Sequence, residues 1–591
     1  MSALSTTPPA GRLPTLGLAG VVLLVATTVP AQPPSGEQDT SPAQTFGETV
    51  EVNLVNVEVW VTDRDGQPVS GLRADDFELR EDGEAVEIRY FAEVGGATLI
   101  PAEGAAGPEA ESRVAAYADP AHLILYFDQL NLQPVGRQRL IDDVRALLDS
   151  GRVPAERVLI LRQDTDLFTE APFGSSALEL GAALDRIAAS TVRGAQTAQD
   201  KLLTIDRLQR VWQEARENAG RAPALGGTNA DDQACDLFSR RALPDVELYA
   251  REAVNRIAIS VDHLTSVVSF VVALPGPKML LYLSDALETN PGADLLGFVQ
   301  AVCPGRAAIN EFDAPEGLRQ LFHALTQHAN ANRVTIYAMQ PLGLRTLSLG
   351  SAQTGSFDFR ALNRITGLVR ENERDGLALL ASETGGRAVF NRGNLQTALE
   401  GIARELQSYY SLAYEPRHGG DRAEHRIAVD VPGSRLQVRH RRGYRDKSPD
   451  QRMTENLLGA LHLGLVANPL EARLGQGAIR AAGGKRYTIP LHVLVSPDRV
   501  AFLPGPEGEY ARLTVKVMAR NADDPAVAFR QQRYLVEKPG ADGPELLDLT
   551  VDLEVPQGVN VIAVALRDEA TQETSYVSTT LEIDGPVGSG R

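Results

Sequence analysis

The sequence predicts an α/β domain with a doubly wound, mostly parallel sheet, flanked by a small N-terminal β domain and a C-terminal β-sandwich. The central prediction rests on two near-continuous apolar runs, residues 122–128 and 278–285, with helical patterns between them. Such runs are typical of parallel strands that helices cover on both faces. Short strand-like runs separated by turn residues, at both ends of the chain, predict the two flanking β domains.

The chain has 591 residues and a net charge of −19 at pH 7, with 43% hydrophobic residues. This length is enough for about three or four domains. A chain this acidic repels phosphate groups, so we exclude nucleic acid as a partner.

The first 31 residues have the pattern of an export signal. Arg12 is the only charged residue before Glu37, and an apolar stretch from Leu16 to Val29 precedes the small-x-small sequence Val29-Pro-Ala31. This pattern predicts a signal peptide, residues 1–31, and an extracytoplasmic protein that is periplasmic or secreted. The stretch is shorter than the ~20 residues that span a bilayer. Membrane association is therefore expected only if this segment is retained uncleaved.

A small β domain is predicted over residues 46–95, between a linker at 32–45 and a second linker at 96–119. Every second residue from Val55 to Val61 is valine, as in a half-buried strand. The Asp-Gly pairs at Asp65 and Asp82 are turn signals between strands.

The α/β domain is predicted over residues 120–416, with an insertion at 191–243. The insertion contains an amphipathic helix with Leu202, Ile205, Leu208 and Trp212 on one face. Residues 286–314 are expected to form a loop, and residues 342–372 to be irregular or partly helical. The expected strands are 122–128, 158–161, 167–173, 278–285, 334–338, 388–390 and 409–414, and the expected helices lie near 135–150, 177–189, 245–273, 315–331, 374–383 and 394–408.

A β-hairpin is predicted at 417–445, with strands near 425–431 and 435–441 around Pro432-Gly433-Ser434. A link with a short helix follows at 446–485, then a β-sandwich at 486–584 and a tail at 585–591. The sandwich is predicted from six strand-like runs with turn residues between them, at 487–495, 512–519, 530–537, 546–555, 559–567 and 575–583.

Two acids, Asp128 and Asp285, follow the two apolar strands. Ligands of open α/β sheets bind beyond the carboxyl ends of the strands, so the two carboxylates are expected to share one crevice. The alternative is that each acid caps a following helix or simply turns the chain into solvent. The two cysteines, Cys235 and Cys303, fit either a disulfide in an oxidising compartment or two separate thiols.

The order of elements over residues 46–445 resembles a von Willebrand factor A-type domain. More narrowly, it is similar to the bacterial, Acidobacterial-type von Willebrand factor A-related family. The segments that carry the resemblance are Val52-Asn-Leu-Val-Asn-Val-Glu-Val59, Asp75-Asp-Phe77, Glu81-Asp-Gly83, Phe127-Asp128, Thr384-Gly-Gly386, Tyr409-Tyr-Ser-Leu-Ala-Tyr-Glu-Pro416 and Arg442-Gly-Tyr444.

The resemblance implies a divalent-cation site built on an Asp-x-Ser-x-Ser loop, a later Asp and a Thr. Asp128 and Asp285 match the two Asp positions, and Asn131 offers an amide oxygen. Leu130 and Leu132 stand at the two serine positions, where apolar side chains cannot bind a metal. The resemblance thus implies a degenerate metal-ion-dependent adhesion site that holds Mg²⁺, another divalent cation or no metal. Candidates for its threonine are Thr191, Thr197 and Thr228.

A local cluster of five arginines follows the predicted hairpin turn on this acidic chain. One interpretation is a site for an anion or an acidic partner, and the other is a polar strand face whose arginines pair with nearby acids. The cluster consists of Arg435, Arg439, Arg441, Arg442 and Arg445.

The sequence contains no nucleophile elbow, phosphate loop or His-Glu-x-x-His motif. We therefore expect a protein that is not an enzyme. The favoured hypothesis is an exported protein-binding module that presents the crevice at Asp128 and Asp285 to an unidentified protein or peptide. The alternatives are a metal-dependent hydrolase that uses the same two acids, and a purely structural component of an envelope assembly.

Overall fold

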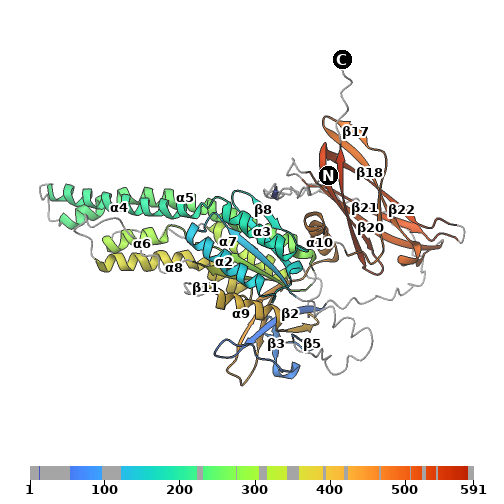
Figure 1. The fold of residues 1–591 in the computed structure, drawn as a ribbon, viewed down its shortest axis with the longest axis horizontal. Coiled ribbons are helices and arrows are strands. Elements are labelled where there is room, and N and C mark those ends of the chain that lie inside the picture. Colours follow the sequence, from blue (N-terminus) through green and yellow to red (C-terminus); the bar gives the residue numbers. More distant parts are fainter. Residues whose placement is uncertain are drawn as a thin grey trace, which may run out of the picture.

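The structure is a computed structural model that describes residues 12–13, 54–95, 121–221, 230–274, 276–304, 316–341, 359–390, 395–417, 423–464, 467–505, 508–521, 527–540 and 543–583. The predicted linkers, the C-terminal tail and nearly all of the predicted export signal lie outside these residues. Figure 1 shows an α/β body with a long helical arm on one side, a small β-sandwich below it and a second β-sandwich on the other side. No helix within the described ranges has the length and hydropathy that crossing a membrane requires.

The α/β body contains a mostly parallel sheet with the strand order β1-β8-β7-β6-β9-β10-β11. The strands from β7 to β11 in this order are parallel, whereas β8 is antiparallel to β7 and the two-residue strand β1 is antiparallel to β8. The predicted mixed α/β class with a mostly parallel sheet is confirmed. The strands are β1 (Arg12–Leu13), β6 (His122–Asp128), β7 (Val158–Gln163), β8 (Leu167–Ala171), β9 (Lys278–Leu283), β10 (Val334–Gln340) and β11 (Ala388–Phe390).

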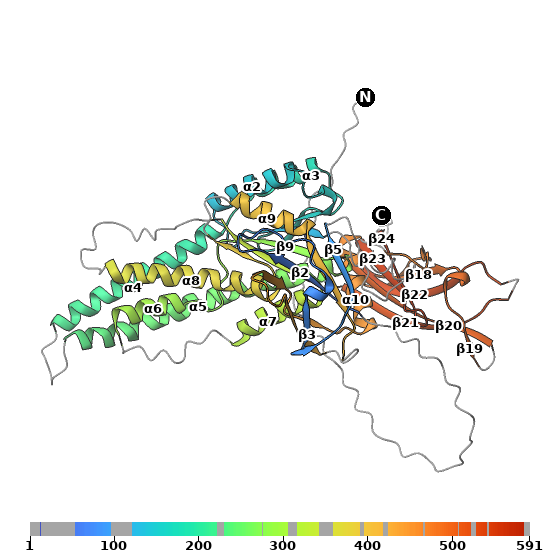
Figure 2. The same ribbon diagram turned by 90° about the horizontal axis from the view of Figure 1, so that it is seen from below.

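Helices cover both faces of this sheet (Figure 2). One face packs on α2, α3 and α9 through residues such as Leu140 and Leu399. The other face packs on α5, α7 and α8 through residues such as Leu264 and Phe322. Burial on both faces explains why the strand sequences are apolar throughout. The helices are α2 (Pro134–Asp149), α3 (Ala177–Ala189), α5 (Ala230–Phe270), α7 (Glu316–Ala331), α8 (Phe359–Glu383) and α9 (Leu395–Gln407).

The small β-sandwich combines the predicted N-terminal β domain with residues 409–445. Its two sheets have the orders β14-β2-β12-β5 and β15-β13-β3-β4, and a shared core joins them. The N-terminal segment alone supplies half of the strands, so the predicted domain at 46–95 is not complete by itself. The strands are β2 (Val55–Thr62), β3 (Glu78–Glu81), β4 (Glu84–Ala85), β5 (Ile88–Val94), β12 (Tyr409–Tyr414), β13 (Glu424–Asp430), β14 (Gln437–His440) and β15 (Gly443–Arg445).

Two predictions about residues 409–445 are wrong. The strand Tyr409–Tyr414, expected in the α/β sheet, lies instead between β2 and β5 and is antiparallel to both. The expected hairpin at 417–445 does not form, because β13 pairs with β3 and β15 while β14 pairs with β2. The turn at Pro432-Gly433-Ser434 therefore connects the two sheets of the sandwich.

Strand β2 is buried along its whole length. Val57 and Val59 face the core of the small sandwich, whereas Glu58 and Trp60 face the α/β body. Trp60 Nε1 donates to the carbonyl oxygen of Glu405 over 3.1 Å, and Glu58 forms an ion pair with Arg333. The predicted half-buried strand is thus covered on its second face by the neighbouring domain.

Lys278, at the start of β9, lies buried near this interface. Its ammonium group donates to the carbonyl oxygen of Asn332 over 3.2 Å. Burial, and next the charge of Arg333, lower the pKa of Lys278 to about 7. Between pH 7 and 10 this lysine is therefore protonated in the unfolded chain but neutral in the folded one. Below pH 7 it is charged in both states, and the folded protein bears the full cost of burying the charge. This destabilisation disappears as the pH rises toward 10.

We expect Lys278→Met to raise the free energy of unfolding by about 1–3 kcal/mol at pH 6, because an apolar side chain removes this buried charge. The gain should shrink steadily between pH 7 and pH 10. Urea unfolding at a series of pH values measures it, with exposed Lys485→Met as the control. A gain that stays constant over this range would contradict the assigned cause.

A helical arm extends from the α/β body. It consists of α4 (Gly194–Arg221), the first half of α5, α6 (Ala293–Val302) and the first half of α8. Its buried core includes Leu208, Phe238, Phe298 and Val369. The arm is larger than the predicted insertion at 191–243. The predicted loop at 286–314 contains α6. Residues 359–372, the described part of the segment predicted to be irregular or partly helical, all belong to α8.

A disulfide joins Cys235 of α5 to Cys303 at the end of α6. The two residues are 68 positions apart in the sequence. This bond resolves the alternative left open by the sequence in favour of pairing, and it ties two of the arm helices together.

The second β-sandwich consists of one sheet around β18 and one around β20, with a common apolar core. All six predicted strands are present, and three short ones (β16, β17 and β19) were not predicted. The alternating burial of β22 explains why period-two patterning identified these strands. The strands are β16 (Arg473–Gln476), β17 (Arg480–Gly483), β18 (Arg486–Val495), β19 (Leu503–Gly505), β20 (Gly508–Asn521), β21 (Val527–Glu537), β22 (Leu547–Pro556), β23 (Gly558–Asp568) and β24 (Thr574–Ile583).

Helix α10 (Pro449–Leu463) connects this sandwich to the α/β body and lies in the predicted link at 446–485. Its Leu457 packs against Met518 of β20. On the other side, the ring of His462 stacks on Phe270 of α5, with the ring centroids 4.1 Å apart.

Candidate functional site

The two acids singled out in the sequence lie at the same edge of the parallel sheet. Strands β6 and β9 are parallel neighbours, Asp128 is the last residue of β6, and Asp285 follows β9 by two residues. Both side chains contact the loop that leads from β6 to α2. The strand ends thus place the two residues at one edge of the sheet, but of the two only Asp285 is among the residues that line the small cavity there.

The carboxylate of Asp128 is buried and accepts five hydrogen bonds from the chain itself. Three come from the backbone N–H groups of Leu130 and Asn131 and from the Asn131 side chain, whose Nδ2 lies 2.7 Å from Oδ2. The other two come from the hydroxyl groups of Tyr282 and Ser284, at 2.6 and 3.0 Å. Burial raises the pKa of Asp128, and these hydrogen bonds act in the opposite direction.

Asp285 has a local role in the same loop. Its Oδ2 accepts a hydrogen bond from the backbone N–H of Gln133 over 2.8 Å, immediately before α2 begins. Its backbone carbonyl accepts from the side chain of Gln340 at the end of β10 over 2.6 Å. These contacts differ from the capping of a following helix, which the sequence left as the alternative, because α2 precedes β9 in the chain.

The donor set at this edge does not fit a divalent cation. The groups around Asp128 are N–H and O–H donors, and Leu130 and Leu132 are buried apolar side chains. Of the threonine candidates, Thr197 donates its hydroxyl to the carbonyl of Leu130 over 3.3 Å, and Thr191 is exposed. Within the described ranges there is no group of three or more His, Cys, Asp or Glu residues able to hold a metal. Thr228 lies outside the described residues.

Helix α4 of the arm covers this edge. Gly194 at its first position lies so close to the loop after β6 that an added Cβ would be 2.2 Å from the carbonyl oxygen of Leu132. About two turns further, the ammonium group of Lys201 forms ion pairs with Glu288 and, at 2.7 Å, with Asp294. The cavity left between these side chains, Asn131 and Asp285 is only about 40 Å³.

We expect Asp128→Asn to lower the free energy of unfolding by about 1–3 kcal/mol, because the amide nitrogen of Asn cannot accept the hydrogen bonds that the chain donates to this side chain. This loss does not depend on a bound metal. The loss should be the same in EDTA and in millimolar Mg²⁺ when followed by urea unfolding. A loss seen only in Mg²⁺ would show that Asp128 binds a cation.

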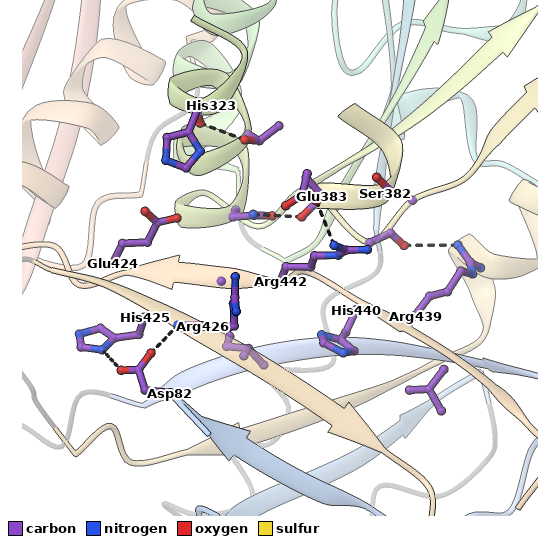
Figure 3. Close-up of a pocket in the computed structure, with 17 residues that line it drawn as sticks. Asp82, His323, Ser382, Glu383, Glu424, His425, Arg426, Arg439, His440 and Arg442 are labelled. Atoms are coloured by element: carbon purple, nitrogen blue, oxygen red, sulfur yellow. Dashed lines mark hydrogen bonds and ion pairs between the residues drawn. The ribbon is translucent and has the colours of Figure 1, made fainter. Parts of the chain in front are cut away.

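A much larger cleft lies between the small β-sandwich and the α/β body (Figure 3). It has a volume of about 840 Å³. Its walls come from the ends of α7 and α8, from β13 and β14, and from the turn at Asp82. The sequence did not predict this cleft as a whole, because its residues come from segments far apart in the chain. Two of its lining residues, Arg439 and Arg442, belong to the arginine cluster noted in the sequence.

Most of the charged groups in this cleft pair within the chain. His425 Nδ1 lies 2.8 Å from Asp82 Oδ2, and Arg442 pairs with Glu383 over 3.0 Å. Both ring nitrogens of His440 are also engaged, with the backbone N–H of Val429 and the carbonyl of Arg441, and burial lowers the pKa of His440.

Two opposite charges on β13 remain available for a ligand. The guanidinium group of Arg426 has no hydrogen bond or ion pair within the described ranges, and the residue is exposed. Glu424, two positions earlier, accepts a hydrogen bond from Gln327 and is exposed as well. Both side chains project from β13 toward the helix that carries His323 (Figure 3).

Three of the five clustered arginines have roles within the structure. Arg439 pairs with Glu405, Arg442 pairs with Glu383, and the buried Arg441 donates to the carbonyls of Asn330 and Asn56. These contacts support the interpretation that the arginines pair with nearby acids and carbonyls.

Comparison with known proteins does not assign a family to this chain. No protein-family model matches the sequence, and no curated protein matches it either.

Proposed function

We propose that the chain is an exported, non-catalytic binding protein that contacts a protein or peptide through the cleft between the small β-sandwich and the α/β body. One observation carries this proposal. The cleft measures about 840 Å³, whereas the cavity at the predicted edge measures about 40 Å³. A ligand of peptide size fits the first volume and not the second.

The α/β body has features that support a von Willebrand factor A-like fold. Counted along the chain, its six main strands follow the order 3-2-1-4-5-6, which is a doubly wound order. The third strand, β8, is antiparallel to its neighbour, and an aspartate ends the first strand, β6. The cation site of that family would be degenerate here, because hydrogen-bond donors of the chain occupy the first aspartate.

Export is supported by the disulfide between Cys235 and Cys303. Stable disulfides are typical of oxidising compartments such as the periplasm and the extracellular space. The apolar stretch on which the export signal rests lies outside the described residues.

The hydrogen bonds at Asp128 weigh against a metal-dependent hydrolase. A catalytic carboxylate must reach the substrate, a metal ion or a water molecule, but both oxygens of Asp128 accept bonds from buried groups of the chain. A purely structural envelope component remains the competing idea, and it differs from our proposal in that no partner would enter the cleft.

Site-specific photocrosslinking in cells tests the proposal. A photoreactive side chain replaces Ser382 in the cleft, Ala198 at the edge cavity or Leu535 on the distant β-sandwich. We expect a discrete adduct from position 382 and none from positions 198 and 535. An adduct from position 198 alone would move the contact to the edge. The absence of adducts from both sites would support the structural alternative.

A further inference from the structure

We propose that the ligand of this cleft carries a free ammonium group and a free carboxylate about 7 Å apart, as in a short peptide with both ends free. This inference rests on the proposed function, because it assumes that the cleft is the binding site. It names the chemistry that the described side chains are able to recognise.

The charge balance of the cleft leads to this ligand class. The pairs His425–Asp82, Arg442–Glu383 and Arg439–Glu405 consume most of its charges. Among the described residues that line the cleft, the acid Glu424 and the guanidinium group of Arg426 stand outside these pairs. A ligand with a single sign of charge would satisfy one of them and be repelled by the other. A ligand with both signs satisfies both.

The spacing of the two groups sets the scale of the ligand. Glu424 and Arg426 are two positions apart on β13, so their side chains point to the same face of the strand. Their backbone positions are therefore about 7 Å apart. The two ends of an extended dipeptide lie at a similar separation of about 7 Å. Arg426 would bind the carboxylate through its planar fork, and Glu424 would bind the ammonium group.

The rest of the lining favours a polar ligand that is recognised by its ends. Ile427 and Val438 are the apolar side chains among the residues that line the cleft, and no Phe, Tyr or Trp occurs among them. Deep apolar anchors for ligand side chains are therefore missing from the described lining. We expect weak dependence on the side chains of the peptide and strong dependence on its two charged ends.

Calorimetric titration of the mature protein with alanyl-alanine tests this inference. N-acetyl-alanyl-alanine lacks the ammonium group, and alanyl-alanine amide lacks the carboxylate. We expect the free dipeptide to bind, and each capped form to bind at least about tenfold more weakly, which corresponds to about 1.4 kcal/mol.

Two variants connect each effect to its residue. Glu424→Gln should remove the preference for the free amino end and keep that for the carboxylate, and Arg426→Gln should do the reverse. Arg530→Gln, on the second β-sandwich, serves as the control and should bind as the wild type does. Thermal melts establish that each variant is folded, and the double variant Glu424→Gln with Arg426→Gln, which removes both charges, should lose binding.

Equal binding of capped and free dipeptides, or no binding of any of them, would overturn the inference. If position 382 still crosslinks to a partner in that case, the ligand class is wrong and the binding role of the cleft stands. If position 382 gives no adduct and the dipeptides do not bind, both the inference and the proposed function fail.

Discussion

Replacing Lys201 by methionine is expected to lower the free energy of unfolding by about 3–5 kcal/mol, because two buried carboxylates then lose their only cation within the described contacts. The side chain of Lys201 is 6% exposed, and those of Glu288 and Asp294 are 9% and 0% exposed. Burial alone would lower the pKa of Lys201, but Asp294 and Glu288 raise it well above its usual value, so the ammonium group stays charged.

Urea unfolding measures the global loss, and hydrogen exchange of the α4 amides shows whether the arm opens first. Adding Glu288→Gln and Asp294→Asn to Lys201→Met removes the unpaired charges and should restore much of the stability. The exposed Lys485→Met is the matched control and should leave the midpoint unchanged. A Lys201→Met protein as stable as this control would contradict the role given to the ion pairs.

Removing the disulfide by Cys235→Ser together with Cys303→Ser is expected to cost about 4 kcal/mol. A cross-link between residues 68 positions apart restricts the unfolded chain, and its loss makes unfolding entropically more favourable. The wild type in dithiothreitol should show the same decrease in its urea midpoint, whereas the double variant should not respond to dithiothreitol. An unchanged midpoint in both cases would show that the bond does not stabilise the arm.

Much of the fold follows from local patterns. The apolar runs at β6 and β9 identify these segments as buried strands without giving their position in the sheet. The alternation of apolar and polar residues identifies β18 and β22. These signals depend on neighbours along the chain. For these four strands they give the type of the element correctly.

The choice of partner strands is not local, and here the predictions failed. The strand Tyr409–Tyr414 is apolar enough for either sheet, and its place beside β2 depends on contacts with residues more than 300 positions away. Helix α6 was expected to be a loop because it is short and follows Pro291-Gly292, where Gly292 has a φ of 89°. The disulfide and the arm core stabilise a helix that its own sequence marks only weakly.

At the candidate site, too, local patterns were predictable and contacts between distant segments were not. Strand ends determine where Asp128 and Asp285 lie, so their meeting at one edge was predictable from two short runs. That helix α4 covers this edge was not predictable. Its Lys201 belongs to the predicted insertion, and the two acids with which Lys201 pairs lie about 90 residues further along the chain. The cleft at Glu424 and Arg426 depends on the unexpected pairing of β13, so the sequence did not show that Arg439 and Arg442 of the arginine cluster line one cleft with them.

The central proposal is that hydrogen-bond donors of the chain, and not a cation, occupy the carboxylate of Asp128 at the edge of the parallel sheet, and that a partner binds in the interdomain cleft. Metal analysis by mass spectrometry tests it most directly, on the mature protein equilibrated with Mg²⁺ or Mn²⁺ and then freed of excess ion. We predict no metal above the level of an Asp128→Ala variant treated in the same way. One equivalent of bound metal per chain that is lost in Asp128→Ala would contradict the account.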